Sequence, residues 1–173
     1  MKFLSRLSGL FGTQQRMSSA SLYRRDGRFF VVTLHGSGGG DPCIAAGPVE
    51  VLPVDARPAE LGEAIIRGLE RTTHNHPYPA SEQEWKQVTA PLFGAALCKS
   101  WPSFAKKASS LRVNRTEGKI QVLPCARDAK GSFHPVAERE RHLEVPAAEQ
   151  LGTVVAAELE FASTRDDASR NEN

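Results

Sequence analysis

Histidine pairs are the first candidates for chemistry in this sequence. The run THNHP places His74 and His76 two residues apart, so on a strand their rings would share a face, and a carboxylate or Cys98 could complete a zinc site. No second pair of ligands follows at a spacing typical of zinc sites, and Pro77 and Pro79 are typical of a turn. We therefore expect a surface turn here and no bound metal.

The glycine-rich run HGSGGGD at 35–41 has the composition of a phosphate-binding loop. A P-loop requires a lysine followed by serine or threonine at the start of a helix, whereas Asp41 and Pro42 follow the glycines here. We therefore exclude nucleotide binding at this run, which is expected to connect two strands. The protein is expected to use no cofactor.

Nucleophilic catalysis would need a serine or cysteine beside a histidine and an orienting acid. No G-x-S-x-G elbow occurs, and the cysteines Cys43, Cys98 and Cys125 lie in apolar sequence, which predicts free, buried thiols in a reducing cytoplasm. Because catalytic groups assemble in space, a small hydrolase or transferase remains an alternative. A pocket combining Cys125 with a carboxylate and either His134 or His142 would favour it.

Basic residues concentrate between Lys99 and Lys119, a stretch that contains six of them and a single acidic residue, Glu117. Such a run could contact phosphates or an acidic partner. The alternative is a solvated helix face that continues into a solvated hairpin. The whole chain carries a net charge of only +2, so its overall charge does not attract nucleic acid.

Acidic residues alternate in the run AERERHLEV. Glu138, Glu140 and Glu144 would lie on one strand face or on a loop beside it. Together with Asp128, these residues are our candidate patch for binding a protein partner. The alternative is an edge strand that its charges protect from aggregation.

The elements that position these residues occur in two similar copies. LGEAIIRGLE at 61–70 returns as LGTVVAAELE at 151–160, and each is preceded by a predicted hairpin with an acidic residue and glycine at its turn. A third strand is expected at 49–54 and at 142–145. The order strand, strand, strand, helix therefore occurs twice, which predicts one α+β domain with helices packed on a sheet. Gly62 and Gly152 are expected to let each helix approach the sheet.

The domain is expected to span 21–163, with pseudo-repeats at 21–72 and 110–163 and a helical connector at 80–109. In the connector, Ser81 and Glu84 form a capping box, Pro91 should interrupt the helix, and the following PLFGAALC should be buried. Residues 1–20 are expected to be a flexible N-terminal segment and 164–173 a disordered tail. No apolar run is long enough to span a bilayer, although 1–12 could form a membrane-touching helix.

The combination of KSWPSFAKKASSLRV, KIQVLP and LEVPAAEQLGTVVAAELE resembles the bacterial contact-dependent growth inhibition (CDI) immunity proteins. The similar stretch runs from about Leu97 to Phe161. The resemblance implies a cytoplasmic, non-enzymatic antidote that binds the C-terminal toxin domain of a large effector one-to-one. Such toxins are commonly nucleases, and many of their antidotes are acidic. The net charge of +2 departs from that pattern.

The sequence thus predicts a protein that inhibits a toxin by covering it, with no catalytic residues and no direct nucleic-acid contact. Two alternatives stay open: the small hydrolase or transferase described above, and a membrane-surface adaptor that uses residues 1–12.

Overall fold

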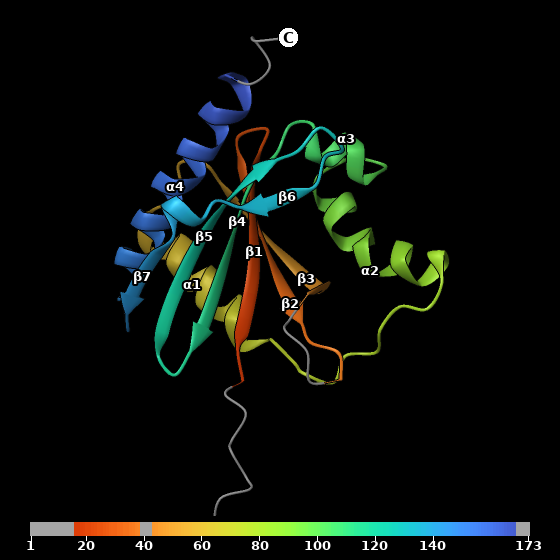
Figure 1. The fold of residues 1–173 in the computed structure, drawn as a ribbon, viewed down its shortest axis with the longest axis horizontal. Coiled ribbons are helices and arrows are strands. Elements are labelled where there is room, and N and C mark those ends of the chain that lie inside the picture. Colours follow the sequence, from red (N-terminus) through yellow and green to blue (C-terminus); the bar gives the residue numbers. More distant parts are fainter. Residues whose placement is uncertain (1–15, 39–42, 169–173) are drawn as a thin grey trace, which may run out of the picture.

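The computed structural model describes residues 16–38 and 43–168. In this part of the chain, seven antiparallel strands form one sheet in the order β3-β2-β1-β4-β5-β6, and β7 pairs with β5 beside β6 (Figure 1). The strands are β1 Ser18–Arg25, β2 Arg28–His35, β3 Ile44–Pro53, β4 Ser109–Thr116, β5 Lys119–Arg127, β6 Phe133–Pro135 and β7 Arg141–Glu144. The helices are α1 Pro58–Glu70, α2 Glu82–Ala95, α3 Trp101–Ala105 and α4 Ala148–Ala168, with a 3-10 turn η1 at Ala137–Arg139. The predicted α+β class is confirmed.

Two tight turns build the two hairpins, as the sequence predicts. Asp26 and Gly27 have φ angles of 47° and 72°, and Glu117 and Gly118 have φ angles of 49° and 79°. Positive φ at both central residues is the conformation that type I′ turns require, and these turns match the twist of paired strands. The β1–β2 and β4–β5 hairpins therefore follow from local chemistry.

Two boundaries differ from those that the sequence predicts. β1 begins at Ser18, so the strand includes three residues assigned to the N-terminal segment. α4 continues to Ala168 and includes residues 164–168, which were assigned to the disordered tail. No glycine or proline interrupts that stretch, so the helical hydrogen-bond pattern can continue through its polar residues.

The two copies are related by an approximate two-fold axis. β1 and β4 pair with each other, and Leu22 lies directly opposite Leu111, its counterpart in the second copy. Equivalent positions can face each other across an antiparallel pair only where such an axis passes. The same hydrogen bond also occurs directly after the third strand of each copy: Val54 N–H donates to Gly27 O, and Val145 N–H donates to Gly118 O.

The glycines of the repeated helices sit where α1 and α4 meet, and the prediction that Gly62 and Gly152 face the sheet is wrong. A Cβ at Gly62 would overlap the carbonyl oxygen of Ala148, and a Cβ at Gly152 would overlap that of Pro58. The contacts are reciprocal, as the approximate two-fold axis requires. The glycine that approaches the sheet is Gly68, where a Cβ would lie 3.2 Å from Val31 Cγ1.

The main core lies between one sheet face and the helices α1 and α4, which lie behind the sheet in Figure 1. Each helix contributes the apolar stripe that its sequence predicts, and alternate strand residues complete the layer. Its fully buried leucine and isoleucine side chains are Leu22, Leu61, Ile65, Leu69, Leu111, Leu151 and Leu159.

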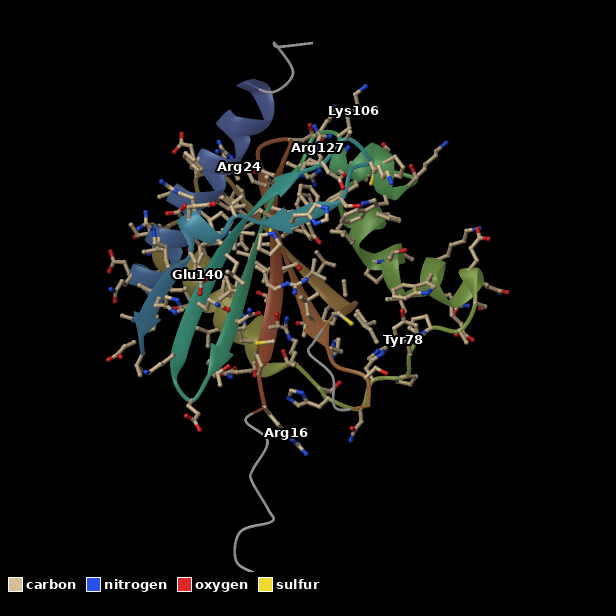
Figure 2. The ribbon with its side chains drawn as sticks, viewed as in Figure 1. Arg16, Arg24, Tyr78, Lys106, Arg127 and Glu140 are labelled. Atoms are coloured by element: carbon tan, nitrogen blue, oxygen red, sulfur yellow. The ribbon has the colours of Figure 1, made fainter. Side chains whose placement is uncertain are left out.

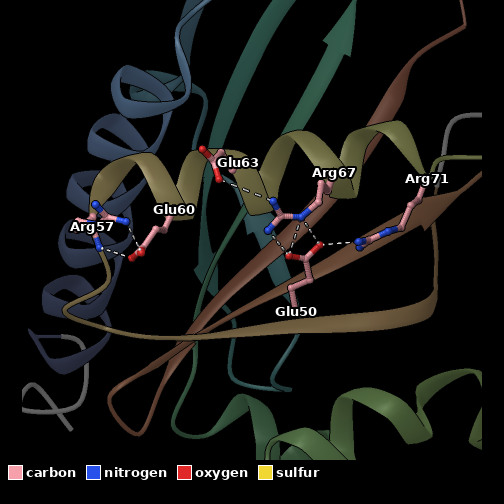
Figure 3. A network of polar contacts seen from close by, with 6 residues as sticks. All are labelled: Glu50, Arg57, Glu60, Glu63, Arg67 and Arg71. Carbon is pink, nitrogen blue, oxygen red and sulfur yellow. Dashed lines mark hydrogen bonds and ion pairs between the residues drawn. The ribbon is translucent and has the colours of Figure 1, made fainter.

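Ion pairs tie each helix to the outer strand of its own copy, with the charges exchanged between the copies. In the first copy, Glu50 on β3 accepts bonds of 2.7 Å from Arg67 of α1 and from Arg71, which directly follows that helix (Figure 3). In the second copy, the carboxylate is on the helix: Glu158 of α4 accepts a 3.0 Å bond from Arg141 of β7. Partial burial opposes the ionisation of Glu50, but the two arginines outweigh it and hold its pKa below the usual value.

The helices α2 and α3 cover part of the other sheet face, over β1, β2 and β3. Ser81 accepts a bond from Glu84 N–H and caps α2, but the predicted capping box is incomplete, because the Glu84 carboxylate accepts from Ala80 N–H rather than from Ser81 N–H. The predicted break at Pro91 is wrong, because α2 runs through it to Ala95. The predicted burial of PLFGAALC is also wrong in part, since Leu97 is 84% exposed.

Candidate functional site

The sheet face opposite α1 and α4 is polar along its two central strands. Side chains alternate in β1 and β4, so Leu22 and Leu111 enter the main core while Ser21, Ser110 and Arg112 lie on the opposite face. This is the face turned toward the viewer in Figures 1 and 2. The two serines are small, which leaves space above the centre of the sheet.

A chain of hydrogen bonds crosses this polar face. Ser19 Oγ donates to Asn114 Oδ1 at 2.6 Å, and Asn114 Nδ2 donates to Gln121 Oε1 at 2.9 Å. Gln121 Nε2 then donates to Glu140, whose Oε1 lies 2.7 Å from His142 Nε2. The chain gives partners to the buried amide and hydroxyl, and it fixes the position of Glu140 beside β7.

A pocket of about 220 Å³ opens on the same face, beside this chain. Ser21, Ser110 and Arg112 line it from the sheet, and Tyr23 and Phe133 are among the residues of its aromatic side. The loop between β5 and β6 contributes the exposed Ser132. The pocket therefore has a polar base and an aromatic wall.

The aromatic wall is held by mutual ring contacts. Tyr23, Trp101 and Phe133 have ring centroids 5.9 to 6.1 Å apart, within the range of favourable edge-to-face contacts. Trp101 Nε1–H also donates to Gly131 O at 3.1 Å. This bond ties the β5–β6 loop to α3, so the shape of the pocket is set by two distant segments.

The ionisable groups of the pocket are poor nucleophiles. Burial raises the pKa of Tyr23 to about 12 and the pKa of Cys125 to about 11. Both groups therefore keep their protons near pH 7, and a thiol rather than a thiolate lines the pocket. Neither His134 nor His142 lines it, so the combination that would favour a hydrolase or transferase is not assembled there.

Arg112 is the charged group of the pocket. It is half-buried, and its guanidinium forms no hydrogen bond or ion pair with another residue in the described part of the chain. Burial of a cation without a partner costs free energy, so a partner is expected from outside the chain. The rest of the predicted basic run does not join it in one patch: Lys106 precedes β4, and Lys119 lies beyond the far end of that strand.

Asp128, the first candidate binding residue, organises the β5–β6 loop. Its carboxylate accepts bonds from the backbone N–H groups of Lys130 and Ser132 at 2.9 and 2.8 Å, and it lies 2.9 Å from His134 Nε2. The bond from His134, with those backbone bonds, holds the pKa of Asp128 below its usual value. This carboxylate therefore has a structural role in shaping the pocket wall.

The remaining candidate acids lie near one another on and beside β7, but they do not share one strand. Glu138 is exposed on η1, Glu140 follows that turn, and Glu144 ends β7 at 84% exposure. Glu144 lies 3.9 Å from Lys119, and Glu140 is held by the polar chain. The structure thus brings these three acids to one side of the polar face, where Figure 2 labels Glu140.

The histidines of THNHP lie in the irregular segment after α1. The ring of His76 stacks on that of His35 with centroids 5.0 Å apart. His35 Nδ1 accepts from Thr73 N–H at 3.2 Å, and burial lowers the pKa of His35. Within residues 16–38 and 43–168, no cluster of three potential metal ligands occurs.

Exposed aromatic residues at the start of α2 were not predicted. Tyr78 and Trp85 pack edge to face at 5.6 Å, and they are 59% and 37% exposed. Tyr78 lies in the segment before α2, where Figure 2 labels it, and Trp85 lies in the first turn of that helix. Cys43 is exposed as well, so the prediction that all three cysteines are buried is wrong.

Comparison with known proteins gives matches in structure. No protein-family model matches the sequence, and no curated protein matches it. Among solved structures, a protein of unknown function from Neisseria meningitidis, NMB0488, has a TM-score of 0.69 and 18% identity, covering 93% of this chain and 99% of its own. A chain of the CdiA-CT/CdiI toxin and immunity complex from Yersinia pseudotuberculosis has a TM-score of 0.68 and 12% identity, covering 85% and 97%.

The chain shares its fold with one chain of a CDI toxin and immunity complex. A fold found in such a complex agrees with the sequence resemblance, and nearly the whole of each matched structure takes part. The described helices include none that is long and apolar enough to span a membrane. Residues 1–12, which the membrane-adaptor alternative requires, lie outside the described residues.

The alternation of polar residues along β1 and β4 is a signal in the sequence for the polar face that carries the pocket. Polar residues recur at every second position, as Ser19 and Ser21 in one strand and as Ser110, Arg112 and Asn114 in the other. On strands that pair at the centre of a sheet, this pattern indicates a polar second face. The aromatic wall had no such signal, because its three rings come from three distant segments.

Proposed function

We propose that this protein is an immunity protein, which binds and neutralises the C-terminal toxin domain of a CDI effector. The observation that carries the proposal is the similarity in fold to a chain of a toxin and immunity complex, over 85% of this chain. The sequence resemblance in the second half of the chain selects the immunity partner rather than the toxin. The proposed complex is a one-to-one heterodimer in the cytoplasm.

Inhibition would occur by coverage of the toxin, without any covalent step. The pocket supports this mechanism, because burial keeps the Cys125 thiol and the Tyr23 hydroxyl protonated. His134 and His142 are each paired with a carboxylate outside the pocket. Tight binding with slow release is required, since a released toxin molecule can act on many substrates.

Co-expression tests the function. The toxin domain encoded immediately upstream should arrest growth when expressed alone, and this protein should restore growth and co-purify with it in a one-to-one complex. Expression of this protein alone should leave growth unchanged. Growth arrest by this protein alone would instead assign it the toxin role, and the absence of both rescue and complex would exclude the immunity function.

The acids beside β7 test whether the toxin, if it is a nuclease, presents its basic cleft to this side of the protein. If the toxin presents a basic nucleic-acid cleft to this side, replacing Glu138, Glu140 and Glu144 with glutamine should slow association and weaken its salt dependence. A matched control replaces three exposed helix acids on the other side of the sheet with glutamine: Glu63, Glu149 and Glu160. Equal effects of the two sets on the association rate would remove the acids beside β7 from the interface.

A further inference from the structure

Arg112 occupies a position that leaves its charge without compensation. It lies on the central strand β4, opposite Ser21 of β1 and Leu123 of β5, and neither neighbour can accept an ion pair. Two acids of the second copy are already engaged elsewhere: Asp128 is bonded within its loop, and Glu140 is bonded to Gln121. A half-buried guanidinium in this setting attracts an anion.

The other polar groups of the pocket fit the same kind of ligand. Ser21 and Ser110 contribute hydroxyl groups, and Tyr23 keeps its phenolic proton. A guanidinium presents several N–H donors in a planar fork that matches the two oxygens of a carboxylate. A carboxylate accepts hydrogen bonds without needing to donate any, so it suits a pocket rich in donors.

The size of the pocket indicates which carboxylate it takes. About 220 Å³ is below the roughly 300–1,000 Å³ typical of small-molecule sites, so a single side chain fits better than a metabolite or nucleotide. The aromatic wall of Tyr23, Trp101 and Phe133 would cover the aliphatic part of that side chain and exclude water. Exclusion of water strengthens the charged bonds at the base.

We propose that this pocket receives one aspartate or glutamate side chain of the bound toxin, which forms a two-pronged ion pair with Arg112. The proposal rests on the proposed immunity function and deepens it by naming an anchor of the interface. It also gives a role to positive charge in a chain whose net charge is +2, because here the cation lies on the immunity protein and the acid on its target.

Arg112→Gln tests the proposal against a matched control, Arg115→Gln. Arg115 lies three residues farther along β4, so its side chain is on the opposite sheet face, and the same charge is removed. Loss of one partner of a desolvated charge pair should weaken toxin binding by at least about 30-fold, chiefly through faster dissociation. Arg115→Gln should change the Kd by less than about threefold. Thermal unfolding of both variants shows whether they remain folded.

The toxin residue is found by a double-mutant cycle. Each acidic residue of the toxin domain is replaced by its amide, and one replacement should weaken binding as much as Arg112→Gln does. Combined with Arg112→Gln, that replacement should cause little further loss, because the pair is already broken. If no acidic residue couples to Arg112, the proposal is overturned.

A second variant works without removing Arg112. Ser132→Glu places a carboxylate at the mouth of the pocket on an exposed loop residue, where it can pair with Arg112 and compete with the toxin. Ser132→Gln is the neutral control of similar size. Weaker binding with glutamate than with glutamine supports the proposal, and equal binding contradicts it.

A measurement on the isolated protein separates this proposal from the proposed function. In a Trp85→Phe background, Trp101 is the remaining tryptophan, so its fluorescence reports on the pocket wall. Acetate should change the emission saturably, chloride at equal ionic strength should not, and Arg112→Gln should abolish the change. Absence of any wild-type toxin complex would exclude the toxin as the source of the carboxylate, and this titration would then decide whether the pocket binds carboxylates at all.

Discussion

The crossing of α1 and α4 allows a sharp test of the fold, through the substitution Gly62→Ala. The glycine lies against the backbone of α4, where a Cβ would stand 2.9 Å from the Cα of Ala148 and closer still to its carbonyl oxygen. Carbon atoms in contact need about 3.5–4.0 Å. The obstacle is backbone rather than a flexible side chain, so the two helices must move apart.

The expected cost follows from two opposing contributions. Alanine is favoured over glycine inside a helix by about 0.5–1 kcal/mol. Against this, forced separation of α1 and α4 loosens the core beneath them, and overpacking of this kind costs about 1–3 kcal/mol or more. Because backbone meets backbone on both sides of the crossing, the cost should lie near the top of its range, and we expect a net loss of about 1–2.5 kcal/mol. For a chain of this size that corresponds to a lower Tm by about 2–10 °C.

Urea denaturation followed by circular dichroism measures the effect, and Gly94→Ala is the matched control. Gly94 lies in α2 with no atom within 4 Å of a Cβ placed on it, so the same substitution there should stabilise the protein by about 0.5–1 kcal/mol. Gly152→Ala should cost about as much as Gly62→Ala, and the double variant less than the sum, because one separation serves both. Stabilisation by Gly62→Ala would refute the crossing.

Glu158→Gln should lower the free energy of unfolding by about 1–3 kcal/mol, because this buried carboxylate accepts charged hydrogen bonds from Arg139 and Arg141. Glu60→Gln at the surface should leave the free energy of unfolding almost unchanged. Equal losses for the two variants in urea denaturation would contradict this difference. The pKa of Glu50 is lower in the folded than in the unfolded chain, so its ionised form stabilises the fold at pH values above the unfolded-state pKa of about 4.3. The difference in unfolding free energy between wild type and Glu50→Gln should therefore be constant near pH 7 and shrink below about pH 4.3. A difference that grows in acid would contradict this prediction. Iodoacetamide at pH 8 should modify the exposed Cys43 first and Cys125 last, since burial raises the pKa of Cys125 to about 11, and peptide mass spectrometry gives the order.

The hairpins and the repeated helices could be predicted because their signals are local. Asp26-Gly27 and Glu117-Gly118 supply left-handed turn residues at the required spacing, and the apolar stripes of α1 and α4 mark one buried side. The capping of α2 by Ser81 is local as well. In each case the residues that decide the structure lie within one turn or one hairpin.

Other features depend on contacts that the sequence order hides. The stripe of a helix marks which side is buried, but it does not say whether sheet or helix covers each position, so Gly62 was assigned to the wrong neighbour. Pro91 removes one hydrogen bond from α2, yet Leu92 and Ala96 remain buried in the apolar cluster between α2, α3 and the sheet, and the helix continues. The Arg112 pocket was not predicted because β1, α3, β4 and the β5–β6 loop meet only in the folded chain.

The approximate symmetry indicates where specific recognition can reside. On the side of α1 and α4 the two copies make equivalent contacts with each other. Leu22 pairs with Leu111, Gly62 of α1 lies against Ala148 of α4, and Gly152 of α4 lies against Pro58 of α1. On the other side the connector packs chiefly on the first copy, and it meets the second copy where Trp101 contacts Gly131 and Phe133. A change at the crossing of α1 and α4 disturbs two equivalent contacts of the core, whereas a change at an exposed residue of the pocket rim, such as Ser132, alters a surface with little effect on packing. Residues such as Arg112 and Ser132 can therefore vary with the partner while the fold is retained, which is the freedom that an inhibitor needs if each toxin requires its own antidote.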